Sequence, residues 1–166
     1  MKKTLLLACL SLFASAGAGS IPGTKVSYKI AQDAMTGGSA SMVFVDATED
    51  TSGKTYMALV CDLGNATFRF YSKTSLGSRA GEQVLFFYRA DDNRLRTAEG
   101  TLREDTKTGK LSVLDFKYDS PALFQTFATA RMKVVARVNR NSMSSMTLTF
   151  PVKGFMQGFR TIGNCE

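Results

Sequence analysis

Histidine is absent from this chain of 166 residues, and that absence removes several classes of enzyme at once. Without an imidazole there is no Ser–His or Cys–His catalytic pair, and the commonest general base and most zinc sites are lost. Tryptophan is also absent, and there are only three cysteines and three prolines. Neither phosphate-loop pattern, G-x-x-x-x-G-K or G-x-G-x-x-G, occurs. We therefore expect no cofactor.

Long apolar runs are scarce as well, and the clearest one lies at the N-terminus. Residues 4–13 (TLLLACLSLF) follow Lys2 and Lys3 and precede a stretch of small residues. This run is shorter than the roughly 20 residues of a membrane-spanning helix and matches the apolar region of a signal peptide. Two A-x-A sites, at 14–16 and 16–18, place cleavage before Gly17 or Gly19. A buried core helix, or lipid attachment at Cys9, fits this pattern less well.

We therefore divide the chain into a cleaved signal peptide (1–18), a flexible leader (19–24) and a single β-rich domain (25–166). The protein is expected to be exported, to the periplasm or out of the cell, with no transmembrane segment after cleavage. Loss of Lys2 and Lys3 lowers the formal net charge from +7 to +5. This moderate positive charge suits an anionic partner, although it also serves solubility alone.

Export decides how the cysteines are interpreted. Cys9 leaves with the signal peptide, so Cys61 and Cys165 remain as a pair in an oxidising compartment. Closing so long a loop stabilises a fold by about 2–4 kcal/mol. A metal or redox pair is disfavoured, because there is no C-x-x-C motif and no histidine. The sequence predicts a structural disulfide and no metal.

The pattern of residues 25–151 predicts about eight strands separated by turns. Residues 83–90 (QVLFFYRA) are apolar on both faces, as expected for a strand between two layers. One helix is indicated at 120–130, with Ser120 as its N-cap and Pro121 in its first turn, and a second short helix at 155–162. The fold class is mainly β: an antiparallel β-sandwich or strongly bent sheet with one or two short helices.

Carboxylates are the remaining candidate catalytic groups, since some hydrolases need only two of them. The acidic residues fall in pairs at 49–50, 91–92 and 104–105, within turn-like stretches where solvated side chains are the usual interpretation. Residues 107–109 (KTG) match one motif of the serine β-lactamases, but the partner motif S-x-x-K is missing, so the triplet is interpreted as a turn. A carboxylate-dependent envelope hydrolase is kept as the alternative function.

A basic face is the most suggestive binding feature. In the predicted strand 132–138, alternation turns Met132, Val134, Ala136 and Val138 inward. The other side carries Arg131, Lys133 and Arg137, with Arg140 in the following turn. Such a cluster suits phosphate or carboxylate recognition, but a solvated strand face or a charged edge strand has the same pattern. Nucleic acid is disfavoured as partner, because the aromatic residues at 86–88 look like core.

Several segments together carry a family resemblance. They are the strand ending at Cys61, residues 87–91 (FYRAD), residues 131–138 (RMKVVARV), residues 146–155 (MTLTFPVKGF) and Cys165. In this order they resemble the VasI-type proteins associated with type VI secretion and related small exported bacterial proteins of unknown function. A tryptophan expected in the first strand is missing, with Tyr28 in its place. The resemblance implies an exported β-sandwich-like module with a Cys–Cys tie and no established enzymatic activity.

These observations favour a non-catalytic binding or secretion-accessory module of the bacterial envelope, whose partner is an envelope protein or an anionic envelope polymer.

Processing of the N-terminus gives the first testable prediction. Because both cleavage sites follow an A-x-A triplet, the exported protein should lack its first 16 or 18 residues. Intact-mass spectrometry of the exported protein measures this directly. A mature species that retains Met1 would contradict the signal-peptide assignment.

Overall fold

The computed structural model describes residues 17–62, 64–140, 144–163 and 165. Within this part of the chain, twelve elements follow one another: β1 (Gly17–Ser20), β2 (Val26–Ile30), β3 (Met42–Asp46), β4 (Tyr56–Asp62), β5 (Asn65–Tyr71), β6 (Gln83–Ala90), β7 (Arg96–Glu104), β8 (Leu111–Asp115), α1 (Ser120–Thr129), β9 (Lys133–Val138), β10 (Met146–Pro151) and α2 (Phe155–Thr161). Neither helix is long and apolar enough to cross a membrane. The predicted signal peptide falls almost wholly outside the described residues.

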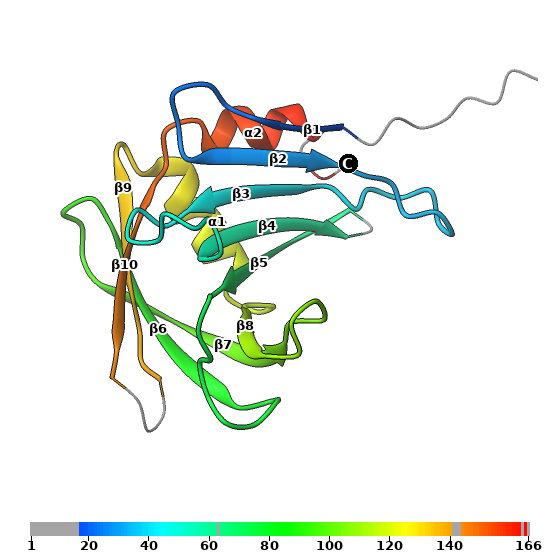
Figure 1. The fold of residues 1–166 in the computed structure, drawn as a ribbon. Helices are drawn as coiled ribbons and strands as arrows, with labels where there is room; N and C mark the ends of the chain where they lie inside the picture. The colour runs from blue at the N-terminus through cyan, green and yellow to red at the C-terminus, as the bar shows by residue number, and fades with distance from the viewer. Residues whose placement is uncertain (1–16, 63, 141–143, 164, 166) are drawn as a thin grey trace, which may run out of the picture.

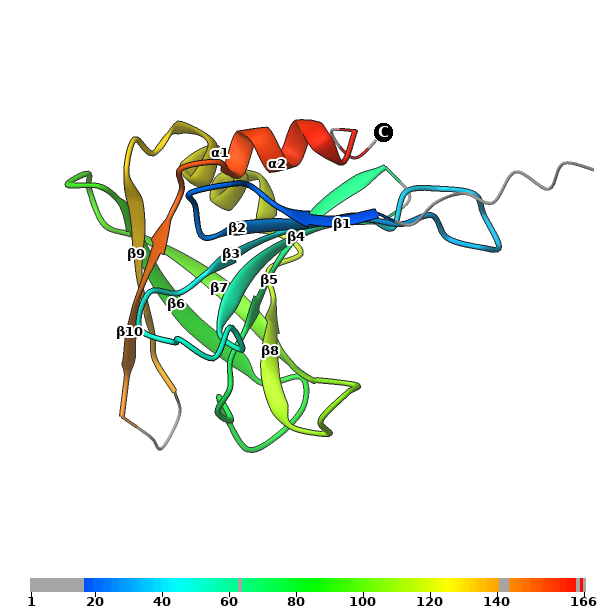
Figure 2. The ribbon, with the colours of Figure 1, turned by 45° about the horizontal axis from the view of Figure 1, so that its top comes forward.

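The strands of the described ranges form one antiparallel sheet in the order β1-β2-β3-β4-β5-β8-β7-β6-β9-β10. Figures 1 and 2 show that this sheet is strongly curled, and in Figure 2 both helices lie near the top, above most of the sheet. The curl brings β10, at one end of the strand order, into contact with β3. The bent-sheet alternative is thus confirmed, whereas the two-layer sandwich is wrong.

A glycine in β7 permits a close approach of β8 and the residue that follows it. A Cβ atom at Gly100 would lie only 2.8 Å from Cβ of Leu114 and 2.9 Å from Cε1 of Phe116. Glycine in the middle of a strand is typical of bends and of such close contacts. A register shift between Arg103 and Glu104 interrupts the β7–β8 ladder nearby, and irregularities of this kind increase local strand curvature.

The core occupies the concave side of the curled sheet and is dominated by phenylalanine. Ring centroids lie 4.9 Å apart for Phe86 and Phe116 and 5.2 Å apart for Phe68 and Phe127. The helices complete this cluster, because Phe127 comes from α1 and packs on Phe155 of α2 at 5.6 Å. The largest fully buried side chains are Met57, Leu59, Phe68, Phe70, Leu76, Phe86, Tyr88, Leu102, Phe116, Phe127, Phe150 and Phe155.

A buried hydroxyl fixes the start of α1 on the sheet. Ser120 is the first residue of the helix and not its N-cap, which is Asp119. The Ser120 hydroxyl donates to the carbonyl of Phe116 at 2.7 Å and accepts from the amide of Phe68 at 2.8 Å. A buried amide without a partner is costly, so this side chain serves β5 as well as the helix.

The predicted disulfide is present and joins β4 to the segment that follows α2. Cys61 lies in β4 and Cys165 follows α2, and their Cα atoms are 5.0 Å apart, within the usual range for such bonds. Both residues are buried. Helix α2 packs on β2 and β3. Gly158 makes this packing tight, since a Cβ there would lie 3.0 Å from Val43 and 3.2 Å from Val26.

The segment expected to be a flexible leader is instead a strand and a turn. Gly17–Ser20 form β1 and pair with β2, with Gly19 opposite Tyr28. The Tyr28 ring covers Gly19 so closely that a Cβ would lie 2.7 Å from its hydroxyl oxygen. Ile21 is buried, and its amide donates to the carbonyl of Val26 at 2.8 Å. The polar, glycine-rich composition of residues 19–24 gives no local sign of these contacts, because they are made with β2.

The outer edge of β10 is occupied by a loop from the other half of the sheet. The amide of Thr48 donates to the carbonyl of Thr149 at 2.9 Å. The amide of Thr149 in turn donates to Oε2 of Glu49 at 2.9 Å. These two hydrogen bonds connect residues about 100 positions apart and hold the loop after β3 on the last strand.

Removal of the disulfide should destabilise the fold without abolishing its secondary structure. The double variant Cys61→Ala/Cys165→Ala should lose about 2–4 kcal/mol of unfolding free energy, because the unfolded chain is no longer cross-linked. Urea denaturation followed by circular dichroism measures the loss. A chemical reductant should produce a similar loss in the wild type and none in the variant. Equal stability of wild type and variant in the absence of reductant would refute this account.

Candidate anion-binding groove

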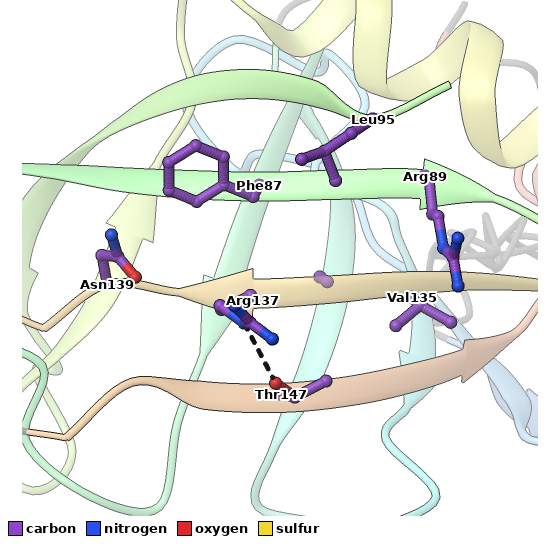
Figure 3. A pocket seen from close by; sticks show the side chains of 8 residues that line it. Phe87, Arg89, Leu95, Val135, Arg137, Asn139 and Thr147 are labelled. Carbon is purple, nitrogen blue, oxygen red and sulfur yellow. Dashed lines mark hydrogen bonds between the residues drawn. The ribbon is translucent and has the colours of Figure 1, made fainter. Parts of the chain in front are cut away.

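A groove of about 600 Å³ lies on the outer face of the sheet, over β6, β9 and β10. Figure 3 shows side chains from these three strands, together with Leu95 just before β7, projecting into the same space. Its lining is mainly apolar with two guanidinium groups, and consists of Phe87, Arg89, Leu95, Val135, Ala136, Arg137, Asn139 and Thr147.

Strand register explains why charged and apolar side chains alternate in the groove. Across β6 and β9, Phe87 is paired with Arg137, and Arg89 with Val135. All four side chains point outward, because their neighbours Phe86, Tyr88, Val134 and Ala136 are buried in the core. Arg89 and Arg137 are therefore diagonal neighbours, with Cα atoms about 7–8 Å apart as usual for such positions.

The two guanidinium groups are available to a ligand. Among the described residues, no carboxylate forms an ion pair with Arg89 or Arg137. Arg137 makes one long hydrogen bond, from Nε to the hydroxyl of Thr147 at 3.4 Å, drawn in Figure 3. No acidic side chain from the described part of the chain lines the groove. Two unneutralised guanidinium groups over an apolar floor favour an anionic ligand.

The predicted basic residues take different positions. Arg137 lines the groove, whereas Arg131, Lys133 and Arg140 are not among its lining residues. Lys133 is exposed at the start of β9, opposite Pro151. Arg140 donates from Nε to the carbonyl of Ser144 at 2.7 Å and from Nη2 to the Ser144 hydroxyl at 3.1 Å. Its guanidinium is thus bound to a residue just before β10.

The inward orientation predicted for Met132 is wrong, because 71% of this residue is exposed. Alternation fails here since β9 begins only at Lys133. The preceding backbone is held by Asp91, whose carboxylate accepts hydrogen bonds from the amides of Arg131, Met132 and Lys133 at 2.8–3.0 Å. These bonds, that of Arg131 first, lower the pKa of Asp91. Val134, Ala136 and Val138 are buried as predicted.

Sequence reasoning missed Arg89, Phe87 and Leu95. It treated residues 83–90 as buried on both faces, whereas Leu85 and Arg89 are exposed and Phe87 is only half-buried. The outer face is open because the sheet is a single layer at this point. Period-two alternation around the buried pair Phe86 and Tyr88 was the available signal, since it turns the intervening Phe87 outward.

Two other grooves on the outer face combine cations with carboxylates. In the first, of about 610 Å³, Asp115 lies between Arg69 and Arg103, with Nε to Oδ2 distances of 3.6 and 3.0 Å. The second, of about 340 Å³, contains Asp105 beside four lysines: Lys54, Lys73, Lys107 and Lys110. Lys73 in this groove is paired with buried Asp50 at 3.2 Å. These carboxylates offset part of the positive charge.

A smaller groove of about 270 Å³ beside α1 contains Arg94 and Arg96 but lacks large apolar side chains. Its volume falls below the roughly 300–1,000 Å³ of typical ligand pockets. The groove over β6, β9 and β10 therefore has the strongest combination of size, apolar surface and uncompensated charge.

Two neighbouring carboxyl groups have pKa values shifted in opposite directions, which is the pattern expected of an acid–base pair. Burial raises the pKa of Asp46. Hydrogen bonds, first that of the Ser52 hydroxyl at 2.6 Å, hold the pKa of Asp50 well below its usual range. Neither residue lines any of the four grooves described above, so Asp50 is best explained as an anchor for the loop at Ser52 and for Lys73.

No set of three or more acidic or cysteine side chains in the described ranges is placed to hold a metal ion. Comparison of the chain with protein-family models, curated proteins and solved structures gave no match. The candidate site therefore rests on the geometry of its own residues.

Asp50 generates a prediction about acid stability. Its lowered pKa in the folded state means that the ionised carboxylate stabilises the fold above pH about 4 and that this contribution is lost as the pH falls further. Asp50→Asn should cost roughly 1–3 kcal/mol at pH 7, with the difference from wild type shrinking below pH about 4. Thermal melts from pH 3 to pH 7 measure it. The exposed turn variant Asp92→Asn serves as control, and an Asp50→Asn penalty that persists unchanged at pH 3 would contradict this role.

Proposed function

We propose that this protein is an exported, non-catalytic binding or secretion-accessory module of the bacterial envelope, and that it recognises an anionic envelope polymer or an acidic surface of an envelope protein. The single observation that carries the proposal is the pair of unneutralised guanidinium groups, Arg89 and Arg137, in the groove over β6, β9 and β10. Two such groups provide charge-assisted hydrogen bonds to carboxylate or phosphate oxygens.

Export is supported by the N-terminal pattern of Lys2, Lys3, the apolar run and the A-x-A sites. The Cys61–Cys165 disulfide is compatible with it, because such bonds persist in oxidising compartments. The resemblance to VasI-type proteins supports the secretion-accessory form of the proposal. The hydrolase alternative has less support, because the two oppositely shifted carboxyl groups, Asp46 and Asp50, line none of the four grooves.

A carboxylate-rich polymer tests anion recognition. Binding of the mature protein to immobilised polygalacturonate should weaken as salt shortens the Debye length from about 10 Å at 0.1 M to about 3 Å at 1 M. Arg89→Gln/Arg137→Gln should lose at least about tenfold in affinity at 0.1 M salt, because two charge-assisted hydrogen bonds are removed. Surface plasmon resonance measures both effects.

The matched control is Arg131→Gln/Lys133→Gln, which removes the same charge from exposed residues that are not among the groove's lining residues. This control should lose less than about threefold, since only the general charge of the protein changes. Equal losses in the two double variants would show that binding follows net charge and not the groove. Thermal melts establish that both variants are folded.

A further inference from the structure

The groove over β6, β9 and β10 has an apolar component that anion binding alone does not require. Of the five large apolar residues exposed in the described chain, Leu85 (41% exposed) and Leu95 (58%) both lie on this face. Leu95 lines the groove with Phe87 and Val135, which are half-buried. Isolated exposed apolar residues are common, but a contiguous group beside charged residues marks a binding surface.

Main-chain pairing excludes one class of occupant from the part of the groove over β6 and β9. Strand β6 is paired with β7 on one side and β9 on the other, and β9 is paired with β6 and β10. Neither β6 nor β9 therefore has a free edge, so an extended peptide cannot bind over these two strands by adding a strand. Recognition depends on side chains, namely the two guanidinium groups and the apolar surface between them.

The arrangement of these side chains fits a ligand with an anionic head and an aliphatic tail. Arg89 and Arg137 occupy diagonal positions in the register, while Phe87 and Val135 occupy the opposite diagonal. One carboxylate or phosphate can thus be reached by both arginines while a chain lies over the apolar residues. A volume of about 600 Å³ suits a single small molecule and not the surface of a bilayer.

We propose that this groove binds a monomeric anionic amphiphile, with its carboxylate or phosphate held between Arg89 and Arg137 and its aliphatic chain on Phe87, Leu95 and Val135. This inference rests on the proposed anion-binding function and narrows it to one ligand class. It assigns Leu95, at the entrance to β7, a binding role that polymer recognition does not require.

Matched probes separate the charged part of the ligand from the apolar part. Calorimetric titration with decanoate or decyl phosphate, below the micelle-forming concentration, should give binding at least tenfold tighter than with acetate or inorganic phosphate. Decanol should also bind at least tenfold more weakly than decanoate, because it lacks the charge. Along hexanoate, octanoate and decanoate, affinity should rise by up to about fourfold for each added methylene, the limit for full burial.

Variants locate the two parts of the site. Arg89→Gln/Arg137→Gln should weaken decanoate binding at least tenfold but leave the weak binding of decanol unchanged. Leu95→Ser should weaken decanoate binding about threefold to tenfold without loss of stability, since Leu95 is largely exposed. Arg131→Gln/Lys133→Gln should bind as wild type. Amide chemical-shift changes on decanoate binding should concentrate in β6 and β9.

Three outcomes would overturn the inference: acetate binding as tightly as decanoate, unchanged decanoate affinity in Arg89→Gln/Arg137→Gln, or binding only to phosphatidylglycerol vesicles and not to the monomeric probes. The polygalacturonate experiment distinguishes this failure from that of the proposed function. If the polymer still binds through Arg89 and Arg137 while decanoate does not, only the ligand class is wrong. If the affinity for neither probe changes in Arg89→Gln/Arg137→Gln, the proposal that the groove recognises anions is wrong as well.

Discussion

The fold depends on one constraint: a single long sheet has an apolar face that no other element of the described residues is large enough to cover. The two helices, of ten and seven residues, shield only part of it. The sheet therefore curls and buries this face largely against itself. Phenylalanines from β5 and β10 pack on Phe127 of α1, and Phe86 of β6 packs on Phe70 of β5. Because Gly100 has no side chain, Leu114 and Phe116 can pack directly against its backbone.

The same constraint places the candidate site. Since the helices and the aromatic rings fill the concave side, the outer side of β6, β9 and β10 receives no covering layer, and the described chain has no further element to provide one. The outward residues of these strands are thus free to differ from a core pattern. Their alternation of arginine with phenylalanine or valine is a property of strand register, and the core beneath fixes the backbone positions from which both arginines project.

The local features of this fold were predictable from sequence where one physical rule dominated. Once Cys9 was assigned to the predicted signal peptide, Cys61 and Cys165 had no competing partner, and period-two alternation correctly buried Val134, Ala136 and Val138. Predictions failed where a contact distant in sequence decided the outcome. Asp91 binds the amides before β9 and exposes Met132, and Tyr28 covers Gly19 and orders β1. Arg89 was overlooked because its strand was assumed to have a layer on each side, a global property that no local pattern reports.

The loop after β3 also bears on how copies of the protein behave in a crowded compartment. An open strand at the end of a sheet is a template for edge-to-edge polymerisation. On β10 the central position of that template is already blocked, because both backbone groups of Thr149 are bonded, to Thr48 and Glu49. The opposite end is β1, only four residues long and half glycine, which makes a poor nucleus for cross-β growth. Neither edge strand of this large sheet, β1 or β10, is therefore a good template for fibril formation.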